Sequence, residues 1–406
     1  MKIKINKSSQ QISFIVVAQS LIFALFADIK PINLALTNGQ FIGEGAMSIL
    51  YPFVIALVII SIFFSKKRIK ESFRRYSVLL PMCLIIFFFY TSYFIGPPRI
   101  SLPMFVTFTV FAFLLPHLLH INPQLAIKAM MFYPCFSIFR LSLIFYFTVS
   151  WKDSINMDLA YAFLIPIASN IVYLRFFYKE ECLFQKIITI ALTIVNSVFL
   201  AQCVLFGSRG PILCLILLVL FLWIIKNDND TYSINYRKMY ISILIGFVML
   251  ISFIEILSFL EEFLANYNIS VLAISKILNL SQSGDISNGR EDLLNNTFSL
   301  IWDRPFCGYG LDRFESVVVT SSYPHNFLLQ ILFDGGIALL LLFSPIVYYF
   351  KKTIKNVSKE VFILLVLLFF TSVPGALFSQ DLWNISILWL FFGTLVSKDH
   401  MINENL

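Results

Sequence analysis

The chain has 406 residues, of which 59% are hydrophobic and 13% are charged, and its formal net charge is +7. A soluble chain needs more polar residues to cover its surface, so the composition excludes a soluble globular protein and indicates a polytopic membrane protein. The basic residues are scattered over loop ends without a continuous stripe, and we therefore expect no nucleic-acid partner.

Apolar runs of about 17 to 25 residues, the length needed to cross a bilayer core, recur along the whole sequence. We expect an all-α fold of about twelve transmembrane helices, in a single membrane domain that covers residues 1–406. The first run lacks a small-residue cleavage site, so we interpret it as a retained helix. The expected spans are residues 12–27, 46–64, 78–95, 101–119, 129–149, 159–177, 185–205, 211–226, 239–258, 326–349, 360–379 and 383–397.

The distribution of Lys and Arg tests this topology, because cytoplasmic loops next to spans are enriched in these residues. With both termini inside, 21 of the 30 basic residues fall in inside segments, eight fall in outside segments and Arg140 lies within the fifth run. The bias predicts that both termini are cytoplasmic. For Arg140 two interpretations are open: it marks a substrate path, or it pairs with a polar group of a neighbouring helix or lies near a span end.

The stretch "FGSRGPILCLILLVL", residues 206–220, opens the eighth span. Ser208 or Gly210 is a suitable cap for this helix, and Pro211 suits its first turn. Arg209 then stands at the outer end of the helix. It is either a snorkelling anchor at the membrane interface or one part of an anion site.

A loop of about 67 residues, 259–325, separates the ninth and tenth spans, and the topology places it outside. Long loops in compact proteins commonly carry function. Residues 263–280 have apolar residues at roughly helical spacing, and we expect them to lie on the membrane surface or to pack on the bundle. Further on, Asn288 and Glu291 resemble a capping box, which predicts a helix of about fifteen residues that ends before Pro305.

Arg290 falls in the first turn of this exterior helix, where the free N–H groups already make the helix end positive. It needs an anion, which is either the neighbouring Glu291 or Asp292, or a bound phosphate. The turn "GYG", with Gly308 and Tyr309, is flexible enough to let its backbone approach a ligand closely. The alternative is a plain reversal of chain direction.

The stretch "SSYPHNFLLQ", residues 321–330, leads into the tenth span. We expect Pro324 to start this helix and to place His325 and Asn326 in its first turn. The positive helix end disfavours a charged imidazole, which keeps His325 available as a base near neutral pH; the alternative is a hydrogen-bonding bystander. Asn326, Gln330 and Asp334 form a polar stripe at intervals of four, and that face must point into protein or a wet cavity.

Together these motifs resemble the O-antigen polymerase and O-antigen ligase superfamily: "SRG" before one span, "GR" and "P-x-x-GYG" in a long exterior loop, and "PHN-x-x-L…GG" opening the next span. The specific motifs cover about residues 206–340. The resemblance implies a metal-independent glycosyltransferase that needs no cofactor, has a fold similar to the GT-C membrane transferases and works at the periplasmic face of the bacterial inner membrane.

The resemblance also implies roles for particular residues. The donor is a glycan linked to undecaprenyl pyrophosphate, Arg209 and Arg290 bind the pyrophosphate, and His325 takes the proton from the acceptor hydroxyl. We expect inversion at the anomeric carbon, because no exposed carboxylate is an obvious nucleophile. The residues predicted to support the site are Asn326, Ser208, Gly308, Tyr309 and Asp334.

Polymerase and ligase differ in the acceptor, which is another lipid-linked oligosaccharide in one case and the lipid A core in the other. The motifs favour a polymerase of O-antigen, capsular polysaccharide or another exopolysaccharide, working in the lipid bilayer with a chain-length regulator as a further partner. A ligase is the alternative. A transporter or flippase is a third hypothesis, but the sequence shows no repeated halves and its unusual residues collect on one side.

Overall fold

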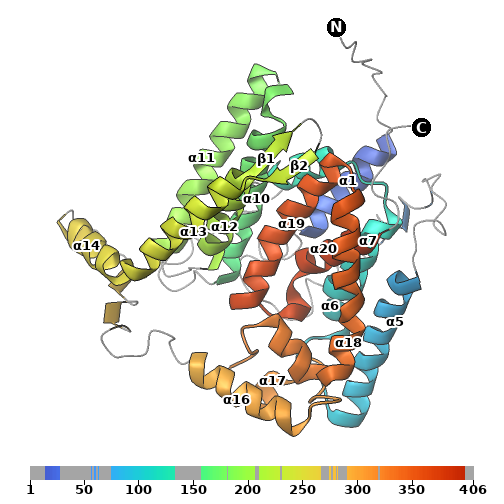
Figure 1. Ribbon diagram of the computed structural model, residues 1–406. Helices are drawn as coiled ribbons and strands as arrows, with labels where there is room; N and C mark the ends of the chain where they lie inside the picture. Colours follow the sequence, from blue (N-terminus) through green and yellow to red (C-terminus); the bar gives the residue numbers. More distant parts are fainter. Residues whose placement is uncertain are drawn as a thin grey trace, which may run out of the picture.

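A computed structural model describes residues 14–27, 56, 59–60, 63, 75–132, 157–180, 182–205, 210–228, 231–266, 274–275, 278–279, 281, 290–318 and 321–397. Nearly all of these residues are helical (Figure 1). Ser208, Arg209 and Arg140 lie outside the described residues. All structural statements that follow concern the described part of the chain.

The long helices of the first half lie at six of the expected spans, and their apolar composition explains why they form. The spans expected at 46–64 and 129–149 lie mostly outside the described residues. The described helices of this half are α1 (Phe14–Ala27), α5 (Arg75–Tyr90) with the π-helical continuation η1 (Thr91–Ile95), α6 (Leu102–Phe105), η2 (Val106–Phe111), α7 (Ala112–Leu118), α10 (Met157–Phe176), the short η3 (Tyr178–Glu180), α11 (Leu183–Leu205) and α12 (Gly210–Ile224).

The second half contains the helices of the predicted long loop and three α-helices after it. Its elements are α13 (Tyr236–Ile251), α14 (Phe253–Ala265), α16 (Arg290–Asp303), α17 (Phe314–Val317), α18 (Phe327–Asn356), α19 (Lys359–Phe378), the 3₁₀ turn η4 (Leu382–Asn384) and α20 (Ser386–Val396).

Three of the described helical segments are long and apolar enough to cross a membrane: Arg75–Ile95, Phe327–Thr353 and Lys359–Phe378. The bent pair α13 and α14 adds a fourth if it is one span, and several further helices are apolar but shorter. This architecture is that of an α-helical membrane protein. The number of twelve spans stays a prediction.

The connection between α12 and α13 differs from the all-α expectation. Strands β1 (Ile225–Asp228) and β2 (Thr231–Ile234) pair antiparallel, with Ile225 opposite Ile234 and Asp228 opposite Thr231. Ile, Thr and Tyr favour strands, and the Asn and Asp residues of "KNDNDT" favour a turn between them. Hydropathy alone does not separate such a short hairpin from a polar loop.

The expected ninth span, 239–258, is also bent in the structure. The helix breaks between Ile251 and Phe253, and α14 leaves α13 at an angle of 69°. No residue of α14 is buried, and Phe259 and Phe263 are both exposed. The predicted exterior loop therefore begins as the exposed apolar helix α14.

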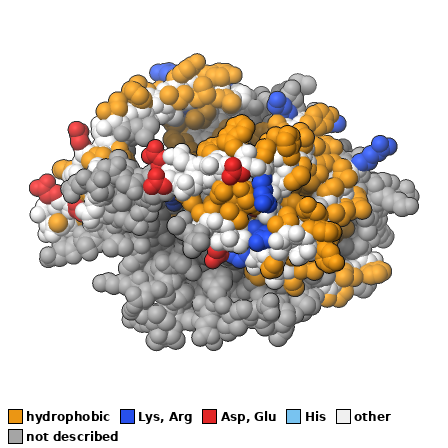
Figure 2. Space-filling model, turned by 90° about the horizontal axis from the view of Figure 1, so that it is seen from below, with side chains coloured by type: hydrophobic (Ala, Val, Ile, Leu, Met, Phe, Trp, Pro, Cys, Tyr) orange, Lys and Arg blue, Asp and Glu red, His pale blue; other side chains and the backbone are white. Residues whose placement is uncertain are grey.

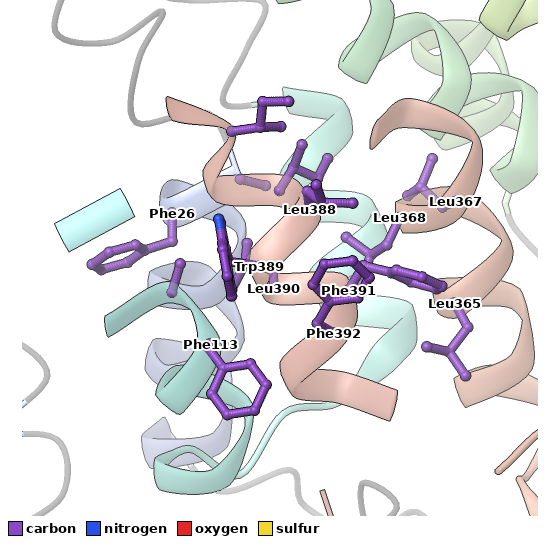
Figure 3. Close-up of a cluster of buried hydrophobic side chains, with 14 of the residues drawn as sticks. Phe26, Phe113, Leu365, Leu367, Leu368, Leu388, Trp389, Leu390, Phe391 and Phe392 are labelled. Atoms are coloured by element: carbon purple, nitrogen blue, oxygen red, sulfur yellow. The ribbon is translucent and has the colours of Figure 1, made fainter. Parts of the chain in front are cut away.

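The best-packed part of the fold is built around α20, whose eleven residues are all buried. Phe113 of α7, Leu368 of α19 and Trp389 of α20 belong to the same apolar cluster (Figure 3). Burying large aromatic and branched side chains in this way fixes the relative positions of the helices that carry them.

The two ends of the bundle differ. Figure 1 shows α16 and α17 across the lower end of the helices and the β1–β2 hairpin near the upper end. The chain enters α18 and α12 at the lower end and leaves α12 into the hairpin at the upper end. The starts of α12, α16 and α18, which carry the sequence motifs, are thus on one side of the molecule.

Candidate functional site

Helix α18 is interrupted by a kink at Gly336, whose backbone angles of φ 60° and ψ −154° are not helical. The turn that contains Tyr309 and Gly310 fills the gap from one side. The N–H of Tyr309 donates to the carbonyl of Phe333 at 2.8 Å, and the N–H of Gly310 donates to the carbonyl of Asp334 at 2.8 Å. Carbonyl groups that the kink leaves without helical partners are satisfied in this way.

The same loop supplies acceptors for the helix beyond the kink. Ile337 N–H donates to the carbonyl of Pro305 at 2.8 Å, and Ala338 N–H donates to that of Phe306 at 3.2 Å. A Cβ atom on Gly308 would lie 2.5 Å from the carbonyl atoms of Asp334, so only glycine fits there. The close backbone approach expected of the "GYG" turn is therefore made to α18, and this turn holds the kink together.

The polar face of α18 points into the protein, as predicted from its spacing. Gln330 and Asp334 are both buried. The indole N–H of Trp383 donates to Oδ2 of Asp334 at 2.6 Å, and the amide N–H of Gln330 donates to Oδ1 of Asp381 at 2.7 Å. The two side chains tie the first turns of α18 to the segment between α19 and α20.

The start of α18 differs from the prediction. The helix begins at Phe327, and Asn326 is its N-cap: Oδ1 of Asn326 accepts hydrogen bonds from the N–H groups of Leu328 and Leu329 at 3.0 and 3.2 Å. His325 precedes the cap in the left-handed region, with φ 56°. The prediction that Pro324 starts the helix was wrong, because the Asn side chain satisfies the first free N–H groups and closes the helix there.

His325 is partly buried beside Tyr323, and the centroids of their rings are 4.3 Å apart. Burial, together with the positive charge of Arg290, lowers the pKa of His325 to about 4. Its Nδ1 atom is buried and has no hydrogen-bond partner among the described residues. The imidazole is therefore neutral across the physiological pH range, as a proton acceptor must be.

Arg290 is the first residue of α16 and is exposed, with Glu291 and Asp292 in the same first turn. The helix ends at Asp303, so the prediction of a helix that stops before Pro305 is confirmed. The effect of Arg290 on the pKa of His325 shows that the mouths of α16 and α18 are close enough to interact. An anion bound between the two helix starts would contact the guanidinium of Arg290 and free N–H groups of the helices.

The N-terminus of α12 lies near the loop that contains His325. Gly210, its first residue, packs so closely that an added Cβ would lie 2.8 Å from Oγ of Ser379. The hydroxyls of Tyr161 and Ser379 share a hydrogen bond of 2.5 Å, and the hydroxyl of Tyr323 donates to the carbonyl of Ser379 at 2.7 Å. Ser379 thus joins the start of α12 to the loop of His325. Arg209 directly precedes Gly210 in the chain.

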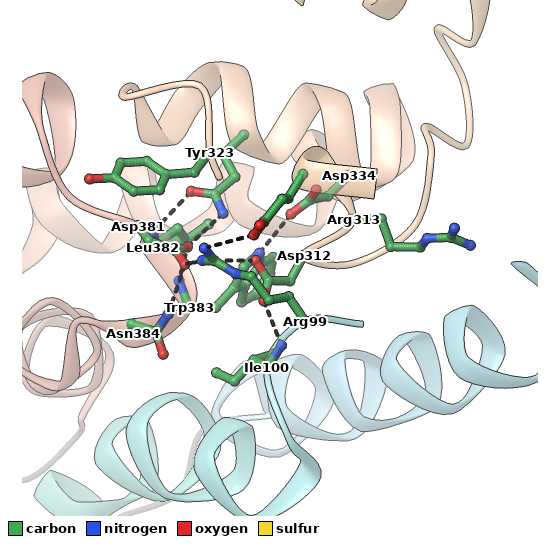
Figure 4. Close-up of polar contacts among 12 residues, drawn as sticks. Arg99, Ile100, Asp312, Arg313, Tyr323, Asp334, Asp381, Leu382, Trp383 and Asn384 are labelled. Atoms are coloured by element: carbon green, nitrogen blue, oxygen red, sulfur yellow. Dashed lines mark hydrogen bonds and ion pairs between the residues drawn. The ribbon is translucent and has the colours of Figure 1, made fainter. Parts of the chain in front are cut away.

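The sequence did not predict a partly buried charge network around Arg99 (Figure 4). Nη2 of Arg99 is 2.5 Å from Oδ2 of Asp381 and 3.5 Å from Oδ1 of Asp312, and Nη1 is 3.6 Å from a carboxylate oxygen of the exposed Glu315. The backbone N–H of Ile100 donates to Oδ2 of Asp312 at 2.7 Å. The network links three loops on the same side of the bundle.

The two buried carboxylates of the network have different environments. Asp381 also accepts from the backbone N–H of Trp383 at 3.2 Å and from the side chain of Asn384 at 2.8 Å. Burial and the negative charge of Asp381 raise the pKa of Asp312 to about 8, although Arg99 works in the opposite direction. Asp312 therefore holds its proton near neutral pH.

A signal for this network does exist in the sequence. Arg99, Asp312 and Asp381 are charged residues next to Gly, Pro or apolar span ends on the same predicted side. Charged groups near apolar helices are expected to pair with one another, but the sequence does not show which ones meet. Within the described residues, no three His, Cys, Asp or Glu side chains are grouped to hold a metal ion.

Residues 194–344 match the sequence model of the O-antigen ligase family. This segment is similar to the O-antigen ligase domain. The matched segment extends from α11 into α18 and includes Arg209, Arg290 and His325. The predicted resemblance to the O-antigen polymerase and ligase superfamily is thereby confirmed. No curated protein matches the chain.

The O-antigen ligase family consists of glycosyltransferase-like enzymes that act on lipid-linked polysaccharide. Two members of the charge network, Arg99 and Asp381, lie outside the matched segment, whereas Asp312 lies inside it. The network therefore connects the matched segment to residues on either side of it.

Proposed function

We propose that this protein is a bacterial polysaccharide polymerase of the O-antigen, capsular or exopolysaccharide type. It transfers a glycan from undecaprenyl pyrophosphate to a sugar hydroxyl of another lipid-linked repeat unit. The position of His325 supports this proposal most strongly. The charge of Arg290 contributes to its lowered pKa, which keeps the imidazole neutral. Contacts through Tyr323 and Ser379 connect it to the N-terminus of α12.

The reaction is a single displacement at the anomeric carbon of the donor. The acceptor oxygen forms a bond to that carbon while the bond to the pyrophosphate oxygen breaks, and the electron pair leaves with the pyrophosphate. His325 takes the proton of the acceptor hydroxyl, which contributes about 10²- to 10⁴-fold to the rate. One displacement inverts the anomeric configuration.

Arg209 and Arg290 stabilise the leaving group in this proposal. Each is next to a helix start, at α12 and α16 respectively, where free N–H groups add positive potential. Guanidinium groups bind phosphate oxygens in a bidentate manner and neutralise the charge that develops on them. We therefore propose that no metal ion takes part. Purified protein should turn over in the presence of a strong chelator, and a requirement for a divalent cation would contradict this assignment.

The membrane orientation is part of the proposal. We place the lower end of the bundle, with α16 and His325, at the periplasmic face of the inner membrane, and both termini in the cytoplasm. Support comes from the upper end, where the β1–β2 hairpin and the neighbouring start of α13 carry Lys226, Arg237 and Lys238. Enrichment in Lys and Arg is typical of the cytoplasmic side.

A ligase that transfers the glycan to lipid A core is the second candidate, favoured by the description of the matching family as O-antigen ligase. Deletion of the gene and electrophoresis of the surface polysaccharide distinguish the two. Loss of the ladder with one repeat unit still attached to lipid A core supports the polymerase. Loss of every attached repeat unit supports the ligase instead.

A further inference from the structure

We propose that the outer flank of α16, made of Phe298 and Trp302, sits in the headgroup region of the bilayer together with Phe306, which follows the helix, and contacts lipid. The inference depends on the membrane setting of the fold and not on the reaction proposed above. Contact between this surface and lipid holds α16, with Arg290 at its start, at a fixed depth in the bilayer.

The first observation is that α16 has two unlike sides. Leu293, Thr297 and Ile301 are buried against the protein, and Leu293 and Ile301 pack in one cluster with Phe333 of α18. Phe298 and Trp302 follow one another at an interval of four, so they lie on a common flank of the helix. Their exposed fractions are 47% and 78%, which is unusual for such large apolar side chains.

The second observation is the length of α18. Its 30 residues are more than the about 20 that cross a bilayer core of about 30 Å. The part after the kink at Gly336 is about twenty residues long and by itself spans the core. Before the kink, Leu329 and Phe333 are covered by α16 and its loop. After it, Ile337 and Leu341 are exposed.

The third observation places Phe306 at the boundary between the covered and the exposed parts of α18. The hydrogen bond from Ala338 N–H to the carbonyl of Phe306 fixes Phe306 beside the first residues after the kink. The ring of Phe306 is 70% exposed and the neighbouring Ile337 is 41% exposed. Phe306 therefore continues the exposed apolar surface of α18, and Trp302 precedes it by four residues, next to the last residue of α16.

The chemistry of the flank matches a lipid interface. Trp and other aromatic residues concentrate at the membrane–water boundary, where their rings lie among the headgroups. The guanidinium of Arg304 lies 4.7 Å from the ring centroid of Tyr309. Figure 2 views the molecule from this end and shows extended hydrophobic areas beside a group of charged side chains near the centre of the face.

Site-directed spin labelling of the full-length protein in phosphatidylethanolamine and phosphatidylglycerol nanodiscs tests the proposal. One label replaces Trp302 (Trp302→Cys) and the control replaces Asn296 (Asn296→Cys), an exposed residue on another side of α16, both in a cysteine-free background. We expect the ratio of collision rates with oxygen and with a water-soluble nickel complex to be several-fold higher at 302. Equal ratios at the two positions would overturn the proposal.

A second measurement leaves the native cysteines in place. Tryptophan fluorescence of the wild type is quenched by lipids brominated near the headgroup, and Trp302→Phe removes the exposed indole but keeps an aromatic ring. The quenched fraction should fall in this variant, whereas Trp389→Phe, at a buried position on α20, is the control and should not lower it. Identical quenching in the wild type and in Trp302→Phe contradicts lipid contact and points to a protein partner or solvent at this flank.

Discussion

The ring of Tyr323 lies 4.3 Å from the ring of His325, and the hydroxyl of Tyr323 donates to the carbonyl of Ser379. This relationship gives the histidine a fixed neighbour, because Tyr323 is itself anchored to the end of α19. The imidazole is in turn held in a left-handed backbone position, with φ 56°. We interpret Tyr323 as a residue that positions the base.

Tyr323→Phe keeps the ring contact and removes the anchoring hydrogen bond. Such a bond contributes about 1 kcal/mol, so we expect kcat to fall about fivefold with little change in KM for the lipid-linked donor. Steady-state kinetics with purified protein provides the measurement. Tyr240→Phe, at an exposed position on α13, is the control and should leave kcat unchanged. A loss confined to KM would argue against a positioning role.

The pH dependence of the reaction should show the lowered pKa of His325. A base must be unprotonated, so activity is expected to persist down to about pH 5 and to fall only as the pH approaches about 4. Arg290→Gln removes a positive charge that contributes to this lowering and should move the acid limb of kcat/KM to higher pH. If kcat/KM of the wild type instead fell at the ordinary pKa of histidine, His325 would not have the buried, positively charged environment that lowers its pKa.

The loop that closes the kink of α18 gives a prediction about stability. Gly308→Ala and Gly336→Ala each place a Cβ about 2.5 Å from backbone atoms of the opposing segment, at positive φ, and we expect either change to lower the melting temperature strongly. Gly246→Ala is the matched control, because nothing lies within 4 Å of its added Cβ. That helical position should be stabilised by about 0.5 to 1 kcal/mol. Similar melting temperatures for all three variants would contradict the packing of the loop.

Asp312 makes stability depend on pH. Its pKa is about 8 in the folded protein and about 3.9 when unfolded, so the unfolded chain gives up the proton first. The stability that the protonated carboxyl provides is therefore complete below about pH 4 and is lost progressively as the pH rises to about 8. The melting temperature should fall between about pH 5 and pH 8, and less so in Asp312→Asn. Asp303→Asn, at an exposed position, should behave like the wild type.

The sequence predicted the helices better than it predicted their ends. Hydropathy placed α18 and α19 correctly because a membrane helix must be apolar over its whole length. The start of α18 was assigned to Pro324, since proline suits a first turn, but the side chain of Asn326 decided the boundary. Competition between two plausible caps depends on backbone angles that the sequence does not show.

The candidate site was also predicted in part. Helix-mouth arguments singled out Arg290 and His325, and the structure brings them within electrostatic reach. Tyr161 and Ser379 were missed, because they come from α10 and the end of α19 and meet only in the folded protein. The same holds for Arg99, whose partners are more than 200 residues away in the chain.

The proposed reaction depends most on His325 as the base. The decisive measurement is the turnover of His325→Gln in nanodiscs with purified lipid-linked donor and acceptor, beside binding of the donor alone. Arg237→Gln, at the opposite end of the bundle, is the control. We predict that His325→Gln loses about 10²- to 10⁴-fold in turnover while binding donor normally. Turnover within tenfold of the wild type, with normal polymer assembly, would contradict the account and favour a transport function.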